Sequence, residues 1–392
     1  MDQKQLKSLA VLGYNFALHI LRSLIPRKKR NQAEVFKGYF KSDWIGAFTP
    51  EEQELIFNLE ACTVCGLCNQ VCLPASLGDG RFLGPEHLVS CAGRSQPEYI
   101  FDLDDFYHCT LCGKCEEVCP EEVKISQLAL LMRRWIERVN PERFWEIFPG
   151  VKENLERFGN PFGKPRESSS DKPEPGARIL FTGCYEQVFG EPGHWQELLK
   201  SQGIETALVD NLCCGGILEE LGVNRFDSGM EKLLAFKPAE IITICPHCYS
   251  ALKKKVSEQV PVKFILEFIS APASSVLAGK KVLYFEPCRL RNFPGLKDRT
   301  EKLLKGLGAE LVKYPEEEQG DCCGAGGGII FYEQDFAHQL AEKKVQQAKK
   351  TGAEIILTEC TLCQNLLSAP AKEQGLKVER LSRVLIRQGG RK

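Results

Sequence analysis

Two short cysteine runs have a spacing that suits iron–sulfur chemistry. Thiolates hold [4Fe–4S] clusters. In each run two residues separate the first three cysteines, which wrap around one cluster, and three residues later a fourth cysteine reaches the other cluster. The second run ends in Cys119-Pro120, whereas the first has Leu73 before its proline. We therefore predict two cubane clusters, one held by Cys62, Cys65, Cys68 and Cys119, the other by Cys109, Cys112, Cys115 and Cys72. A pair of zinc sites is the alternative, but zinc rarely combines three such cysteines with a crossing fourth.

Ten further cysteines follow a pattern that occurs twice in the second half of the chain. Each copy has one cysteine, then Cys-Cys-Gly, then Cys-x-x-Cys. The copies are Cys184, Cys213, Cys214, Cys245 and Cys248, and Cys288, Cys322, Cys323, Cys360 and Cys363. Equivalent cysteines are 104, 109 and 115 residues apart, so the copies differ by short insertions. Adjacent cysteines point in different directions and can touch two irons, and the following glycines let the backbone approach a cluster closely.

From residue 177 onward, short β-rich runs alternate with helical ones. The expected strands are 178–182, 240–244, 281–285 and 354–358, and the expected helices include 193–202, 296–307 and 331–350. This alternation predicts parallel α/β sheets. The cysteines follow the strands, and the ends of parallel strands converge at one edge, the usual place for a ligand. We therefore predict two repeated α/β domains with five thiols each at a sheet edge.

The first half has a different organisation. Helix-like segments at 51–60 and 125–139 surround the two cysteine runs, and Cys91 belongs to neither run, so we expect a buried structural cysteine. Residues 159–176 are dominated by Pro, Gly, Ser and charge, which is typical of a linker. The expected units are 1–44, 45–150, a linker at 151–176, then 177–278 and 279–392.

Residues 4–25 have the pattern of an amphipathic helix. Lys4, Asn15 and His19 share one arc and leucines fill the opposite one, while Pro26 ends the segment and residues 27–30 are all basic. Such a segment can lie in the surface of an anionic membrane, so residues 4–30 predict a peripheral membrane contact. The alternative is a helix that packs on its own protein or on another subunit. The apolar stretch is too interrupted to predict a membrane span.

Composition excludes other classes of protein. The chain has 392 residues, 26% of them charged, and a formal net charge of −1, so no basic excess indicates nucleic-acid binding. Nineteen cysteines could indicate a secreted disulfide scaffold, but the chain is long, the count is odd, and no convincing secretory signal occurs. We therefore expect reduced thiols in the cytoplasm, with a peripheral position at the cytoplasmic face of the inner membrane.

The motif order resembles a known family, the heterodisulfide reductase D-type and glycolate-oxidase iron–sulfur subunits, in which an α-helical ferredoxin domain is fused to two cysteine-rich "CCG" domains. The resemblance implies a multidomain fold and a [4Fe–4S] cluster, which could be non-cubane, on the five cysteines of a CCG motif. The first copy is shorter, with 28 and 30 residues between its motifs against 33 and 36 in the second. One or two further clusters are thus expected beside the two cubanes, with zinc or an ordinary cubane as alternatives.

The sequence contains no nucleotide or flavin fingerprint, so we do not expect the chain to oxidise an organic substrate alone. The resemblance implies an iron–sulfur electron-transfer subunit, which passes electrons between a flavoprotein or other redox subunit and quinone or a membrane cytochrome. The alternative is a catalytic disulfide reductase that cleaves an S–S bond at a non-cubane cluster. His247 could move a proton, and Glu286 and Arg289, which flank Cys288, could tune the charge near a cluster.

Overall fold

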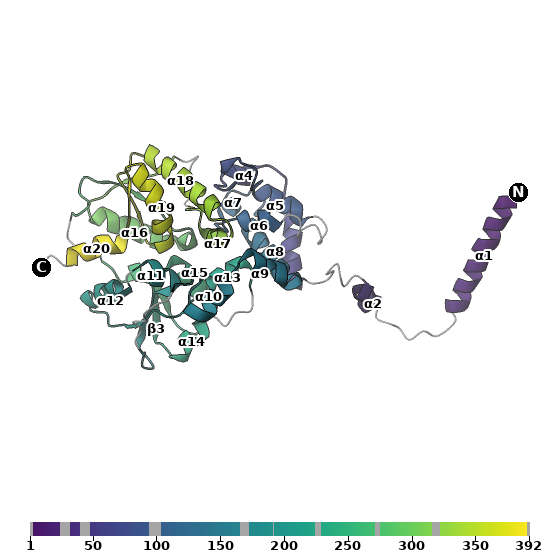
Figure 1. Ribbon diagram of the computed structural model, residues 1–392, viewed down its shortest axis with the longest axis horizontal. Helices are drawn as coiled ribbons and strands as arrows, with labels where there is room; N and C mark the ends of the chain where they lie inside the picture. Colours follow the sequence, from purple (N-terminus) through teal and green to yellow (C-terminus); the bar gives the residue numbers. More distant parts are fainter. Residues whose placement is uncertain are drawn as a thin grey trace. The chain divides into compact units, whose positions relative to one another are not determined.

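The computed structural model describes residues 3–23, 32–39, 48–93, 103–164, 172–190, 192–223, 229–270, 275–315 and 322–389. The chain divides into two units, Met1–Ala47 and Phe48–Lys392, and Figure 1 shows the elements of both. Within the described ranges, no helix has the length and apolar character that crossing a membrane requires.

The first unit contains two helices, α1 (Gln3–Ser23) and α2 (Gln32–Tyr39). Helix α1 confirms the helix expected over 4–25. Its apolar side chains are exposed, with Leu12 at 71% and Phe16 at 64%. The basic residues at 27–30 lie outside the described residues, and the membrane contact stays a prediction.

The second unit begins with a helical region that carries both cysteine runs. Thr49 starts α3 through a capping box with Glu52, and α3 continues as a 3₁₀ turn, Asn58–Ala61. The long α8 is the core of this region because Leu128, Met132 and Trp135 are fully buried, and each such side chain contributes about 1.5–3 kcal/mol. The α-helices are α3 (Pro50–Phe57), α4 (Leu67–Gln70), α5 (Pro85–Ala92), α6 (Leu103–His108), α7 (Lys114–Glu117), α8 (Ile125–Val139), α9 (Pro141–Ile147) and α10 (Val151–Phe158).

The segment assigned to a linker differs from the expectation at its start. Val151–Phe158 forms α10, and Val151 and Leu155 are buried. These two residues are four positions apart and therefore share one helix face, which packs against the protein. Asn160 is also fully buried. The chain is thus structured and packed up to this point, and the remaining domain boundaries stay a prediction.

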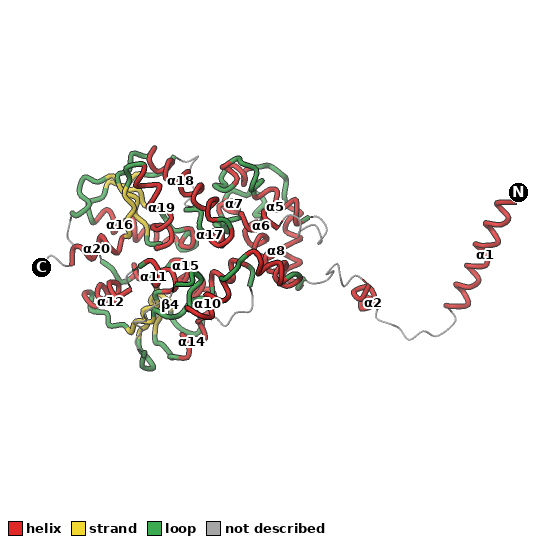
Figure 2. The backbone as a smooth tube through the Cα atoms, in the orientation of Figure 1, coloured by secondary structure: helices red, strands yellow, loops and turns green. Residues whose placement is uncertain are grey.

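Two separate four-stranded sheets follow, shown as two groups of strands in Figure 2. Their orders are β2-β1-β3-β4 and β6-β5-β7-β8, and all pairs are parallel. The identical order confirms the internal repeat and the multidomain α-helical plus α/β fold class. The strands are β1 (Arg178–Phe181), β2 (Ala207–Val209), β3 (Glu240–Thr243), β4 (Val262–Phe264), β5 (Lys281–Tyr284), β6 (Glu310–Val312), β7 (Ile355–Thr358) and β8 (Lys377–Arg380).

Helices connect the strands of each sheet. Those of the first copy are α11 (Gly183–Phe189), α12 (Pro192–Ser201), α13 (Gly216–Leu221), α14 (Gly229–Ala235) and α15 (Pro246–Val256). Those of the second are α16 (Pro294–Gly306), α17 (Ile329–Tyr332), α18 (Gln334–Lys350), α19 (Thr361–Glu373) and α20 (Leu381–Gly389). The helix expected over 331–350 is interrupted at Glu333, whose backbone is extended. Cysteines follow β1, β3, β5 and β7 directly, so the sheets position them at their carboxyl ends.

Candidate iron–sulfur centres

The first cysteine run meets the last cysteine of the second run. One cavity is lined by Cys62, Cys65, Cys68 and Cys119 together. The backbone N–H of Val123 donates to Cys119 Sγ at 3.4 Å, as expected for a sulfur that carries negative charge. The structure thus brings together the four thiols of the first expected cubane, and their role as ligands stays a prediction.

Cys72, the last cysteine of the first run, lies near thiols of the second run, and its role as a ligand there stays a prediction. Burial, and then the nearby thiolates of Cys112 and Cys109, raise the pKa of Cys72 well above its ordinary value. Burial and the charges of Cys109, Cys112 and Cys72 likewise raise the pKa of Cys115. Each negatively charged thiolate makes it harder for the neighbouring thiols to lose their protons. All four can be thiolates together only beside a positive charge, which iron would supply.

The two runs share an unusual backbone conformation. Val64 and Leu111 have φ of 56° and 51°, and the glycines that follow the next cysteine, Gly66 and Gly113, have φ of 74° and 76°. A left-handed backbone costs a residue with a side chain about 1–2 kcal/mol. The same strain at the same place in both loops indicates a functional constraint, and it curls three thiols around one point. This donor set and this loop shape fit a [4Fe–4S] cluster.

Among the described residues, no three His, Cys, Asp or Glu side chains converge closely enough to hold a single metal ion. A cluster of irons and sulfides has a different requirement, because its thiolates attach to separate irons.

In the first cysteine-rich copy, all five thiols are buried. Gly183 has φ +74°, and a Cβ there would lie 2.5 Å from Cys248 Sγ, so only glycine lets β1 deliver its cysteine beside α15. The N–H groups of Gly215 and Gly216 donate to Cys213 and Cys214 Sγ, both at 3.4 Å. Contact with Cys213 raises the pKa of Cys214 to about 11, and contact with Cys248 lowers the pKa of Cys245.

The second copy also gathers its five thiols, but Cys288 and Cys360 are half-exposed. Cys363 Sγ lies 3.4 Å from Cys323 Sγ. The glycine run that follows differs from the expectation, because the atoms nearest to its glycines belong to other segments and not to the five thiols. A Cβ at Gly326 would lie 2.5 Å from the carbonyl oxygen of Thr110. The run therefore lets the second copy press against the loop that carries the second cubane cysteines.

The four thiol groups form a continuous series. A hydrogen bond from Cys322 lowers the pKa of Cys112 well below its ordinary value, which places the second cubane loop against the second copy. The charge of Cys245 acts on Cys360, which places the second copy beside the first. Burial, and then the thiolates of Cys184, Cys245 and Cys360, raise the pKa of Tyr185, so this ring lies among thiols of both copies.

Arg133 is a structural residue that the sequence did not reveal. It is fully buried on α8, and its guanidinium donates only to backbone carbonyls among the bonds described. These oxygens belong to Phe106 at 2.8 Å, Cys109 at 2.6 Å, Glu220 at 2.7 Å and Gly327 at 2.7 Å. The arginine thus joins the ferredoxin loop to both copies. The sequence shows two adjacent arginines, Arg133 and Arg134, inside an apolar stretch, but it does not tell which of them is buried.

The charged residues beside the ligands connect the domains. His247 Nε2 lies 3.1 Å from Glu220, which also pairs with Arg289. Arg289 donates to the carbonyl oxygen of Leu111 at 3.2 Å. Their effects on a cluster stay predictions.

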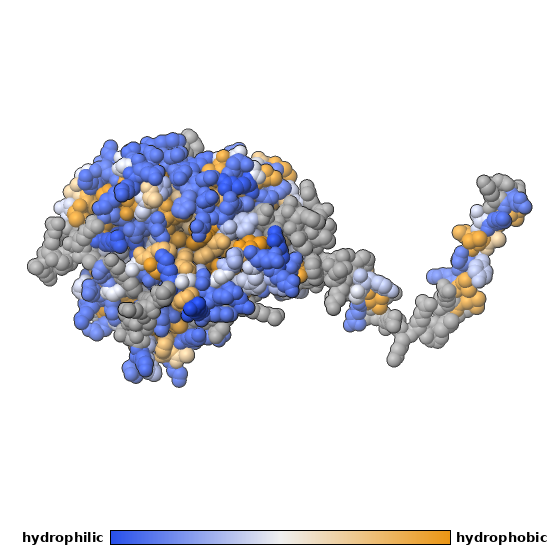
Figure 3. Space-filling model, in the orientation of Figure 1, coloured by the Kyte–Doolittle hydropathy of each residue, from blue (hydrophilic) through white to orange (hydrophobic). Residues whose placement is uncertain are grey.

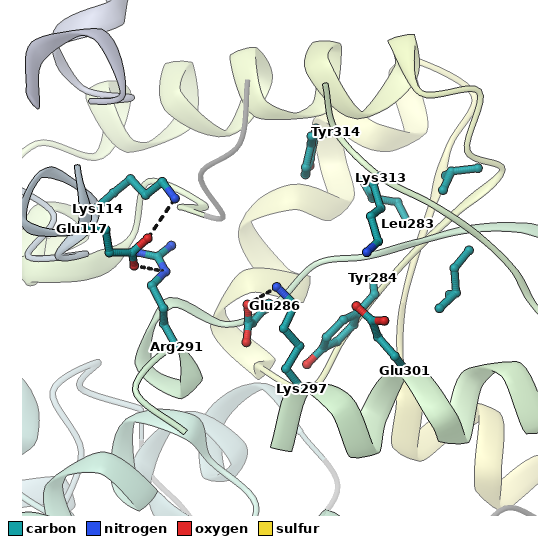
Figure 4. Close-up of a pocket in the computed structure, with 12 residues that line it drawn as sticks. Lys114, Glu117, Leu283, Tyr284, Glu286, Arg291, Lys297, Glu301, Lys313 and Tyr314 are labelled. Atoms are coloured by element: carbon teal, nitrogen blue, oxygen red, sulfur yellow. Dashed lines mark hydrogen bonds and ion pairs between the residues drawn. The ribbon is translucent and has the colours of Figure 1, made fainter. Parts of the chain in front are cut away.

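A cavity of about 230 Å³ lies between α7 of the ferredoxin region and the second copy (Figure 4). Here Arg291 pairs with Glu117 of α7 at 3.0 Å and also donates to the carbonyl oxygen of Cys112 at 2.7 Å. Glu286 pairs with Lys297 at 3.1 Å.

Cys91, outside all motifs, is fully buried as expected, with Sγ 3.2 Å from His87 Nε2.

Two family models match the chain. A 4Fe-4S dicluster domain matches residues 58–123, and a cysteine-rich domain matches residues 179–253 and 282–368. These matches imply iron–sulfur clusters. They cover both cysteine runs and all ten cysteines of the two copies.

Similar proteins are named as parts of redox complexes. A fumarate reductase (CoM/CoB) subunit of Methanothermobacter marburgensis is 30% identical over 52% of this chain and 44% of its own length. EtfAB:quinone oxidoreductase of Syntrophomonas wolfei is 25% identical over 59% of this chain and 39% of its own length. The D-type subunit of dihydromethanophenazine:CoB–CoM heterodisulfide reductase from Methanosarcina barkeri is 22% identical over 80% of this chain and 89% of its own length. The match thus spans less than half of the first two relatives.

A solved structure, a hypothetical protein from Helicobacter pylori, aligns with a TM-score of 0.51 at 10% identity and covers 92% of this chain and 76% of that one. That likeness concerns the fold alone. The two domain matches show that this chain belongs to the iron–sulfur proteins that join a 4Fe-4S dicluster domain to paired cysteine-rich domains, and it is similar to the heterodisulfide reductase D-type subunit of Methanosarcina barkeri.

Proposed function

We propose that this chain is an electron-transfer subunit of a multi-subunit oxidoreductase. The observation that carries the proposal is the contact between Cys112 and Cys322, which belong to the second cubane group and the second cysteine-rich copy. With the interaction of Cys360 and Cys245, it makes one unbroken series of thiol groups through the protein. Electron transfer between clusters requires each redox group to lie beside the next, and this series meets that requirement.

Electrons enter or leave at the first cubane group. Cys65 is exposed, and beside it Val64 is 62% and Leu67 41% exposed, which gives a redox partner an apolar contact next to the cluster. Relatives named as subunits of larger enzymes support such a partner. The partner we propose is a flavoprotein or another redox subunit.

The other end of the relay serves quinone or a membrane cytochrome. The relative named EtfAB:quinone oxidoreductase supports this direction. Exposed leucines and Phe16 along α1 support a peripheral membrane contact, at the cytoplasmic face in our proposal. The proposed cofactors are two cubane clusters on the eight ferredoxin cysteines and one or two further [4Fe–4S] clusters on the ten cysteines of the two copies.

Disulfide reduction is the second candidate, and one cavity favours it. A space of about 610 Å³ reaches Cys112 and the half-exposed Cys288 and is lined by His247, Arg289 and Arg291. A small disulfide would meet both thiol groups there, among arginines whose charge is balanced by Glu117 and Glu220. The similarity to the heterodisulfide reductase of Methanosarcina barkeri also supports this candidate.

One experiment separates the two candidates. The full chain is reconstituted anaerobically, and four clusters predict about 16 iron per chain with equal sulfide. The reduced protein is then mixed with a heterodisulfide or with a quinone, and reoxidation is followed by EPR. A relay should leave the heterodisulfide intact. Thiol release at the rate of cluster oxidation would instead identify a disulfide reductase.

A further inference from the structure

A cavity of about 500 Å³ lies away from the charged spaces described above. It opens between α10, α11, α17, α18 and α19, and Pro161, Phe162, Phe189, Ile330, Phe331 and Leu362 are among its walls. Figure 3 shows apolar side chains gathered on this face where α17 meets α10 and α11. The volume falls in the range of small-molecule sites, roughly 300–1,000 Å³.

Aromatic rings shape this cavity. The Phe162 ring centroid lies 5.0 Å from that of Phe189 and 5.4 Å from that of Phe331, with interplanar angles of 79° and 39°. All three phenylalanines are only half-buried, although large apolar side chains are usually buried. Lys164 Nζ lies 5.0 Å from the centroid of the Phe189 ring, and the three half-buried rings favour a flat, apolar ligand that would extend the stack.

Polar groups are few and lie at the rim. Gln334 and His338 of α18 and Asn365 of α19 line the cavity and are exposed. An amide N–H can donate to a carbonyl oxygen, and a histidine ring N–H can do the same. A flat apolar ring with carbonyl oxygens at its edge therefore matches both the walls and the rim.

The cavity adjoins the thiols of both copies. Leu362, in its wall, lies between Cys360 and Cys363. On the opposite wall, Phe162 packs on Tyr185 with ring centroids 5.3 Å apart. Tyr185 is buried among the thiolates of Cys184, Cys245 and Cys360. Between a ligand in the cavity and the thiols of Cys184 and Cys245 there would thus lie the rings of Phe162 and Tyr185.

We propose that this cavity binds the headgroup of a quinone and is the place where the relay meets its acceptor. The inference rests on the proposed electron-transfer function and names the site where that function ends. Reduction of a quinone to its quinol takes two electrons, supplied by two one-electron oxidations of clusters, and two protons, supplied by solvent at the rim. The chain's own part is to hold the ring between Phe162, Phe189 and Phe331.

The test measures binding of 2,3-dimethyl-1,4-naphthoquinone to the full reconstituted chain by equilibrium dialysis. His338→Trp places a large ring at the rim, and Phe162→Ala removes one wall, so each should weaken binding by about tenfold or more. Gln346→Trp is the matched control, because Gln346 is exposed on α18 and does not line the cavity. Phe57→Ala, an exposed phenylalanine of α3, is the control for the second variant.

A second ligand tests the chemistry. 2,3-Dimethylnaphthalene has the same shape without carbonyl oxygens and should bind about tenfold more weakly than the quinone. Equal binding of both ligands, no quinone binding by the natural chain, or unchanged binding by both cavity variants would overturn the inference.

The proposed relay is tested apart from quinone, by reducing the clusters with a viologen and reoxidising them with ferricyanide. A relay without quinone binding would remove only this inference. If the clusters of the two copies never become reduced, the proposed relay is wrong. The quinone binding measured by dialysis would not be affected by that result.

Discussion

The two ferredoxin loops have the same cysteine spacing and the same left-handed residues, yet their surroundings are opposite. Val64, in the first loop, is 62% exposed, and Cys65 beside it is exposed. Leu111, the equivalent residue of the second loop, is 6% exposed. The second loop is covered by the glycine run of the second copy and by Arg133.

The difference shows how one motif can serve two positions in a relay. An open loop lets an external partner approach its cluster, whereas a covered loop keeps its cluster beside an internal neighbour. Backbone conformation cannot produce this distinction, because it is shared. The neighbours that pack on each loop produce it.

The largest expected effect comes from the crossing cysteines. Cys72→Ser should remove the cluster of the covered loop, and Cys119→Ser that of the open loop, each with a loss of about four iron per chain. EPR of the reduced protein identifies which signal disappears. If Cys72→Ser leaves the signal of the covered loop unchanged, the thiols do not cross and the comparison of the loops fails.

The next effect concerns the residue that holds the covered loop. Arg133→Met should leave buried carbonyl oxygens of Cys109 and Gly327 without a donor and lower the free energy of unfolding by about 3 kcal/mol or more. Urea unfolding of the full chain measures this loss. Arg143→Met is the control, because Arg143 is 58% exposed in its ion pair and should contribute little. Equal losses in both variants would show that Arg133 does not join the domains.

A surface change should act on the open loop alone. Val64→Asp places a charge in the apolar contact beside Cys65 and should slow electron transfer from the redox partner by about tenfold, while iron content stays unchanged. Stopped-flow reduction by the purified partner measures the rate. Val276→Asp is the control, since Val276 is a 44% exposed valine outside the ferredoxin loops. A rate that Val64→Asp does not alter would place the partner elsewhere.

The features that could be predicted from the sequence depend on local spacing. The crossing runs place four thiols together because two residues between cysteines force a tight loop, and β-rich runs before each cysteine indicated both parallel sheets. The contact of Cys112 with Cys322 could not be predicted, because it joins segments about 200 residues apart through packing. The buried role of Arg133 depends on the same packing, since its acceptors come from three distant segments.

The predicted helix over 331–350 was wrong at one residue, Glu333, which lies between α17 and α18. A helix was expected through Glu333, but that residue is extended and turns its carboxylate to His108 Nε2 and to Arg81, both at 2.7 Å. Both partners belong to the ferredoxin region. The helix is broken where its side chain links two domains.

Glu333 gives the smallest expected effect, a pH-dependent one. Partial burial raises its pKa, but hydrogen bonds from His108 and Arg81 outweigh burial, so the pKa lies below the ordinary value of 4.5. A carboxyl whose folded-state pKa is lowered stabilises the fold above its unfolded value and loses that contribution as pH falls through the folded value. Glu333→Gln should therefore cost about 0.5 kcal/mol at pH 7 and less at pH 3.

Urea unfolding of the apoprotein at both pH values measures the difference, since acid releases iron and sulfide. Glu146→Gln is the control, because Glu146 is 66% exposed. If Glu333→Gln costs the same at both pH values, the interaction does not depend on the carboxylate charge. The covered loop would then be held beside the second copy by packing and by Arg133, Arg289 and Arg291, which is the contrast with the open loop in its simplest form.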